Sequence, residues 1–140
     1  MSMSTIGVPL EGFGVYCRAA AAEGAVLLKN EGHMFPLKKE EMVSVFGRCQ
    51  FETYRSGTGS GGAVNVPYAV NIYDGMRESG SFTLNEELAD IYRAWLKDHP
   101  FDNGGGGWAA EPWHQKEMVI TEEIAAAAAE KSEKAIFIIG

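Results

Sequence analysis

Two glycine-rich segments hold the residues whose types could do chemistry. The first, Gly57–Gly62, has the spacing GxGxxG. A dinucleotide site needs this motif directly between a strand and a helix, so that backbone N–H groups and the helix dipole meet the pyrophosphate. The strand expected before it ends near Phe46 and the next helix begins near Val70, which disfavours nucleotide binding. Two interpretations remain: a surface loop whose glycines permit turns, or a loop that approaches a ligand closely, with Thr58 or Ser60 forming hydrogen bonds.

The second segment, residues 101–118, carries Trp108 and Trp113. Indole rings offer large apolar faces that stack on ligands such as sugars or on partner proteins. The same rings can instead fix a loop to the hydrophobic core, and the sequence leaves both interpretations open. Glu111 and His114 lie close by, but an intervening proline opposes a helix that would align them, and two ligands do not make a metal site. We therefore expect no metal, and nothing in the sequence implies a cofactor.

Composition limits the classes of function. The chain has 140 residues, enough for one domain or a piece of one, and its hydrophobic fraction of 46% excludes disorder of the whole chain. The net charge of −7 disfavours a nucleic-acid partner. Cys17 and Cys49 form no CxxC pair, which excludes a disulfide scaffold and a cysteine zinc site and fits a reducing cytoplasm. Because residues 1–14 lack a signal-peptide pattern and no apolar run is long enough to span a bilayer, we expect no membrane association.

Helices and short apolar strands alternate along the chain. The clearest helix is 86–98, whose apolar residues recur with helical period after a capping Asn85. We further expect helices over 11–23, 70–79 and 121–131, buried strands over 25–28, 42–46 and 135–140, and a short strand over 81–83. This order predicts an α/β fold in which a mainly parallel sheet lies between helices on both faces, a three-layer sandwich.

The last expected strand, Ala135–Gly140, would in a parallel sheet be followed by a loop and a covering helix. We therefore expect a truncated domain, in which an open sheet edge after Ile139 favours dimerisation or aggregation.

An ordered series of motifs resembles glycoside hydrolase family 3. The most specific block is Arg18–Glu31, RAAAAEGAVLLKNE, followed by Phe35-Pro36-Leu37, where a phenylalanine replaces the usual leucine. Further matches follow in the same order: Val43–Gly47, Gly57–Gly61, Ile72–Met76 and Ala135–Gly140. The resemblance covers the chain from about Arg18 to Gly140. It implies the α/β sandwich domain of a retaining β-glucosidase that cleaves β-linked glucosides or oligosaccharides.

In that family a barrel domain supplies an aspartate nucleophile, and the sandwich domain supplies an acid/base glutamate in the loop after the strand that resembles Ala135–Gly140. Neither carboxylate has a counterpart here, so we assign no catalytic residue and expect this chain alone to be inactive. The family block begins close to Met1, as in members with the sandwich domain first. We therefore expect residues 1–140 to be one partial sandwich domain of a larger glycosidase, with residues 1–10 as a leader and a separate barrel domain as the partner.

The same resemblance places the loop over residues 48–63 against the barrel's sugar pocket. The side chains expected near substrate are Tyr54, Arg55, Thr58 and Ser60, with Trp108 and Trp113 reaching the same side. A second hypothesis is a stand-alone α/β domain that binds carbohydrate or protein through these loops without catalysis.

Overall fold

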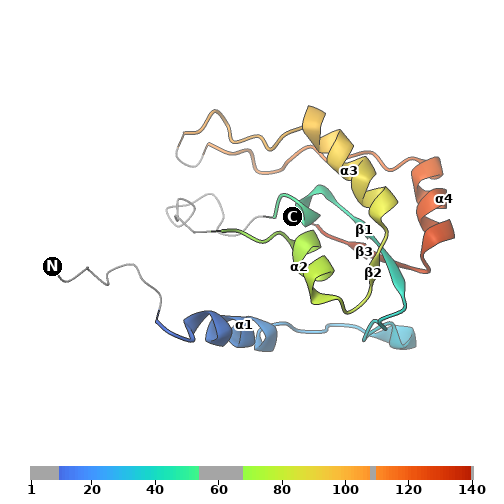
Figure 1. Cartoon of the computed structure of the whole chain (residues 1–140). Helices are drawn as coiled ribbons and strands as arrows, with labels where there is room; N and C mark the ends of the chain where they lie inside the picture. The colour runs from blue at the N-terminus through green and yellow to red at the C-terminus, as the bar shows by residue number, and fades with distance from the viewer. Residues whose placement is uncertain (1–9, 54–67, 108–109, 140) are drawn as a thin grey trace. The chain divides into compact units, whose positions relative to one another are not determined.

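A three-stranded parallel sheet forms the centre of the larger of two compact units in this computed structural model. The structure describes residues 10–53, 68–107 and 110–139, and the units are Met1–Pro36 and Leu37–Gly140. The sheet has the order β2-β1-β3, with β1 at Met42–Phe46, β2 at Thr83–Leu84 and β3 at Lys134–Phe137 (Figure 1). The predicted parallel α/β architecture is confirmed.

Local capping signals set the helix boundaries in this unit. The helices are α2 at Ile72–Ser79, α3 at Glu86–Asp98 and α4 at Glu122–Lys131, close to the predicted ranges. The side chains of Asn71, Asn85 and Thr121 each accept a hydrogen bond from the backbone N–H three residues further on. These caps satisfy backbone donors that a helix start leaves without partners.

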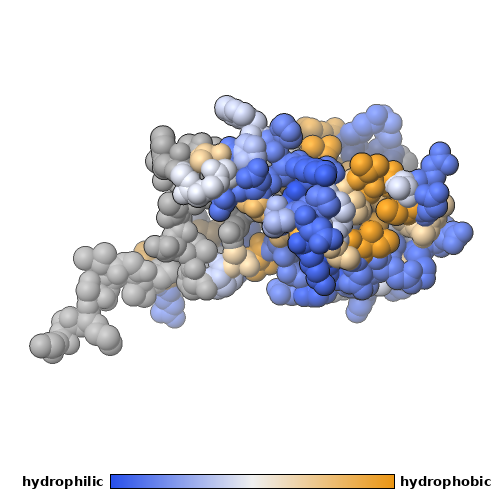
Figure 2. Space-filling model, turned by 90° about the horizontal axis from the view of Figure 1, so that it is seen from above, coloured by the Kyte–Doolittle hydropathy of each residue, from blue (hydrophilic) through white to orange (hydrophobic). Residues whose placement is uncertain are grey.

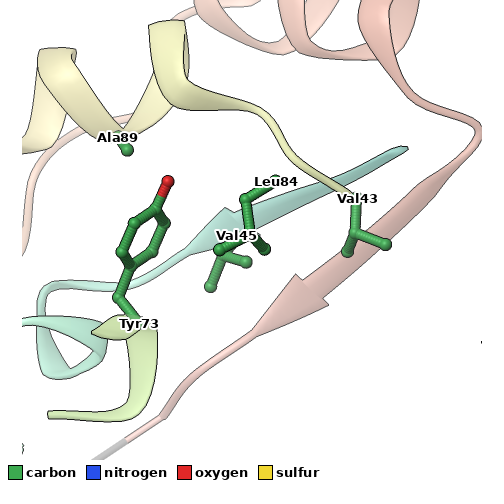
Figure 3. Packing of buried hydrophobic residues seen from close by; sticks show 5 residues of the cluster. All are labelled: Val43, Val45, Tyr73, Leu84 and Ala89. Carbon is green, nitrogen blue, oxygen red and sulfur yellow. The ribbon is translucent and has the colours of Figure 1, made fainter. Parts of the chain in front are cut away.

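The alternation of side chains along β1 distributes the core over both faces of the sheet. Val43 and Val45 lie on one face with Tyr73 of α2, together with Leu84 and Ala89 (Figure 3). Phe46 belongs to a second cluster on the other face. Its other members are Leu88 and Tyr92 of α3, Ala128 of α4, and Met118 from the chain before α4. Helices thus cover both faces of the sheet, and α3 contributes to both clusters.

A buried polar chain joins three elements through Ser44, which is 1% exposed in the middle of β1. Asn85, the cap of α3, donates from its side-chain amide to the Ser44 hydroxyl at 2.9 Å. The Ser44 hydroxyl lies 2.6 Å from that of Ser132, the residue that ends α4. Because every member has a partner, this network costs little to bury and fixes both helices to the central strand.

The predicted buried strand over 25–28 is wrong. This segment follows α1 (Phe13–Glu23) in the smaller unit and has no strand assignment, with Leu28 91% exposed. A short 3-10 turn, η1 (Glu31–His33), comes next. A four-residue apolar run shows only that the side chains favour burial. It does not show that a partner strand exists, and all three strands of the described part of the chain lie in the other unit.

The last strand is present but not buried as expected. Phe137 is 66% exposed and Ile139 is 92% exposed, although Phe137 stacks on Phe46 with ring centroids 4.9 Å apart. β3 lies at the edge of the sheet, with β1 on one side only, and Ile139 lies beyond its last residue. Figure 2 shows hydrophobic patches surrounded by hydrophilic residues. Among the described residues, no helix is long and apolar enough to cross a membrane.

Replacing Ser44 with alanine should lower the free energy of unfolding by about 1–3 kcal/mol, because the buried Asn85 amide and Ser132 hydroxyl lose a partner. Urea unfolding measures this change. Ser81→Ala, at an exposed serine, is the matched control and should cost less than about 0.5 kcal/mol. Equal effects of the two substitutions would show that the buried chain does not stabilise the fold.

Candidate functional site

A pocket of about 360 Å³ opens at the carboxyl ends of β1 and β3, the side on which open α/β sheets bind ligands. Its lining is mainly apolar and includes the chain just after β1. The lining residues are Phe46, Gly47, Arg48, Cys49, Tyr92, Gln115, Glu117, Ile120, Phe137, Ile138 and Ile139.

Gly47 allows the chain to turn at the end of β1. Its φ is 102°, and a Cβ at this position would lie 2.1 Å from the carbonyl oxygen of Ile138. No other residue type fits so close an approach without displacing β3. The Gly47 N–H donates to the hydroxyl of Tyr92 at 2.8 Å, which ties the turn to α3.

Arg48, in the 3-10 turn η2 (Arg48–Gln50), brings a charged group into the base of the pocket. Its side chain is 3% exposed. The guanidinium donates to the carboxylate of Glu52 at 3.0 Å from Nε and again from Nη2, and to the carbonyls of Lys116 at 2.6 Å and His99 at 3.0 Å. It also lies over the ring of Trp95, 5.5 Å from the centroid. These contacts satisfy a buried cation whose desolvation would otherwise be costly.

The carboxylate of Glu117 is committed to the backbone. One oxygen accepts the N–H of Arg48 at 2.8 Å and the other accepts the N–H of Met118 at 2.7 Å. The neighbouring Cys49 is buried, and burial together with the Glu117 charge raises the pKa of its thiol. Cys49 is therefore held as a neutral thiol, which suits packing rather than nucleophilic attack.

The loop that leaves α3 and returns toward α4 is tied across its base. Asp102 and Gln115 form two hydrogen bonds with each other, in addition to those that Arg48 makes. The Asp102 N–H donates to the Gln115 side-chain oxygen at 2.8 Å, and the Gln115 side-chain amide donates to the Asp102 carbonyl at 2.9 Å. Gly104 then turns with φ 63°, where a Cβ would lie 1.8 Å from the carbonyl oxygen of Ala110. We call the described residues of this segment, 99–107 and 110–117, the tryptophan loop.

The structure reaches one of the six predicted substrate-side residues. Tyr54, Arg55, Thr58, Ser60 and Trp108 lie outside the described residues, so they stay predictions. Trp113 is fully exposed. For Trp113 the interpretation as a core anchor is therefore wrong, and its ring is free to meet a ligand or a partner. Within the described ranges, no group of three His, Cys, Asp or Glu residues could hold a metal ion.

Sequence reasoning did not single out Arg48, Glu117 or Tyr92 as residues that organise this site. One signal was available for Arg48: a charged residue directly after the glycine that ends an apolar strand lies at the carboxyl edge of a parallel sheet. The partners of Arg48 were not visible, because two of them lie 51 and 68 residues away in the chain.

Two fully buried tyrosines, Tyr92 and Tyr73, should respond differently to replacement by phenylalanine. Tyr92→Phe should lower the free energy of unfolding by about 1–2 kcal/mol, because the Gly47 N–H loses its acceptor. Burial, together with the nearby Glu86 carboxylate, raises the pKa of Tyr73 to about 12. Its buried hydroxyl forms no hydrogen bond of normal geometry within the described residues, although Glu86 and Arg93 lie close enough to interact with it. Tyr73→Phe should therefore cost less than about 0.5 kcal/mol or stabilise the protein. Calorimetry or urea unfolding of both variants tests this, and a reversed order would contradict the assignment.

Comparison with known proteins agrees with the architecture. Residues 25–140 match the family model described as the glycosyl hydrolase family 3 C-terminal domain. A β-glucosidase from Ruminococcus albus is 49% identical over 119 residues, which are 85% of this chain and 12% of that protein. The chain thus spans only a small part of such relatives.

Solved structures agree over nearly the whole chain. A β-glucosidase from Paenibacillus barengoltzii superposes with a TM-score of 0.93 and 64% identity, covering 99% of this chain and 15% of that one. β-Glucosidase 3B from Thermotoga neapolitana, solved with α-D-glucose, gives a TM-score of 0.78 and 31% identity over 94% of this chain and 18% of that one. The sequence motifs, the parallel sheet and these matches lead to one conclusion: this chain belongs to glycosyl hydrolase family 3.

Proposed function

We propose that this chain serves a retaining β-glucosidase, as part of a longer protein, and that the loops at the carboxyl edge of its sheet border the aglycone side of the sugar site. The observation that carries the proposal is the 64% identity and TM-score of 0.93 with the Paenibacillus barengoltzii β-glucosidase over 99% of this chain. At that similarity, the packing of the sheet and the path of its loops are expected to be shared.

The exposed ring of Trp113 supports the placement of substrate. It stands on the tryptophan loop, whose base Arg48 holds beside the pocket at the end of β1. An exposed indole face on this loop suits stacking on the apolar face of a glucosyl unit. Trp108, Tyr54, Arg55, Thr58 and Ser60 remain proposed neighbours of the same aglycone side.

Retaining hydrolysis needs two carboxyl groups on opposite sides of the glycosidic bond, one as nucleophile and one as acid/base. The two carboxylates bound around Arg48 already have partners: Glu52 binds the guanidinium, and Glu117 accepts two backbone N–H groups. Neither is free to protonate a leaving group or to attack a sugar. As the resemblance to glycoside hydrolase family 3 implies, we propose that a barrel domain elsewhere in the protein supplies the nucleophile, and that this chain alone is inactive.

A chimera tests the proposal. Replacing the matching 15% of the Paenibacillus barengoltzii β-glucosidase with this chain should give an enzyme that hydrolyses cellobiose and p-nitrophenyl β-D-glucoside within about tenfold of the parent kcat/KM, a loss of no more than about 1.4 kcal/mol of transition-state stabilisation. In the chimera, Trp113→Ala should raise KM for cellobiose more than it lowers kcat. Val119→Ala, also at an exposed residue, is the matched control.

Two results would contradict the proposal. One is a folded chimera, with the parent's circular dichroism and size, that hydrolyses neither substrate. The other is saturable micromolar binding of cellobiose by the 140-residue chain, followed by tryptophan fluorescence, because a stand-alone binding module must hold a complete pocket.

A further inference from the structure

We propose that Arg48 is a positioning residue of this site: by joining the two ends of the tryptophan loop, it sets where Trp113 meets the aglycone. The inference rests on the proposed function and adds to it a residue that controls preference for the leaving group. The Arg48 side chain is buried and its donors bind protein acceptors, so its proposed action on substrate passes through the loop.

The geometry identifies Arg48 as the link between the ends of the loop. Nη1 donates to the carbonyl of Lys116 and Nη2 to the carbonyl of His99, at 2.6 and 3.0 Å. The first carbonyl belongs to the returning end of the loop and the second to the residue that ends α3. One planar group therefore fixes the separation of the two ends.

The other side of the guanidinium is held as firmly. The carboxylate of Glu52 accepts hydrogen bonds from Nε and Nη2 of Arg48, and the guanidinium lies over the ring of Trp95. Trp95 in turn stacks on the ring of His99, with centroids 4.2 Å apart and planes 9° apart. The guanidinium cannot shift toward one end of the loop without losing contacts with the other.

Only arginine fits this arrangement. Its fork presents donors in a fixed plane, whereas a lysine ammonium is a single point that cannot reach a carboxylate and two separate carbonyls in the same geometry. The contrast with Arg77 is informative. Arg77 is half-exposed, and its ion pair with Asp74 spans one turn of its own helix. Conversion to lysine should matter at Arg48 and be neutral at Arg77.

The first test uses the chimera with a pair of substrates. Arg48→Lys should lower kcat/KM for cellobiose by about tenfold or more, mainly through KM, because the stacking partner of the second glucosyl unit is misplaced. β-D-Glucosyl fluoride, which has no aglycone sugar, should be hydrolysed within about twofold of the parent chimera, as only aglycone contacts change. Arg77→Lys should alter neither substrate. Equal losses on both substrates, or no loss on cellobiose, would overturn the proposal.

The second test needs no activity and uses the 140-residue chain. Hydrogen exchange followed by mass spectrometry should show faster exchange in peptides from 99–117 in Arg48→Lys, with β1 and α2 unchanged. Glu52→Gln keeps the side-chain size but removes the charge opposite Arg48, so it should show the same pattern more weakly. This variant replaces Arg48→Lys in the test if Arg48→Lys does not fold. Uniformly faster exchange, or a change confined to residues 48–52, would contradict the proposal. If the loop peptides exchange faster in Arg48→Lys but the unsubstituted chimera is inactive, the proposed function is wrong and the positioning role of Arg48 in the loop is not.

Discussion

The buried guanidinium of Arg48 is the constraint on which the arrangement of this site depends. A cation removed from water is stable only when it finds acceptors in the protein, and here the acceptors come from Glu52 just after η2, the end of α3 and the returning end of the tryptophan loop. These three segments must therefore meet at one point beside the carboxyl end of β1. The turn at Gly47 makes that meeting possible, because only glycine allows β1 to end so close to β3.

The central strand organises the rest of the unit through the period of two along its backbone. Val43 and Val45 direct one core cluster toward α2, while Phe46 joins the cluster with α3 and α4. Ser44 adds a polar link on a strand that is otherwise apolar, and it fixes the start of α3 and the end of α4. Ser44 thus holds the start of α3, and Arg48 holds its other end through the carbonyl of His99.

Local signals in the sequence were enough for the order of helices and parallel strands in the larger unit, but they also predicted a strand over 25–28 that the structure does not contain. The range 86–98 was predicted from a capping Asn85 and a helical apolar period, both of which act within a few residues. Burial could not be predicted in the same way: Leu28 and Phe137 are apolar yet exposed, because burial depends on which elements pack against them. The Arg48 site escaped prediction for a related reason, since its partners at His99 and Lys116 are distant in sequence and are backbone carbonyls, which no residue type marks.

The central claim is that Arg48 is a buried cation whose guanidinium is held away from water by hydrogen bonds to Glu52, His99 and Lys116. Side-chain nitrogen NMR of the 140-residue chain measures this directly, with the Nε–H signal of Arg48 identified by its loss in Arg48→Lys. The account predicts that this proton, held by Glu52, stays visible at pH 8.5, where the Nε–H protons of Arg77 and other exposed arginines are lost through rapid exchange with water. An Arg48 signal that disappears together with theirs would show an open, hydrated guanidinium and would contradict the account.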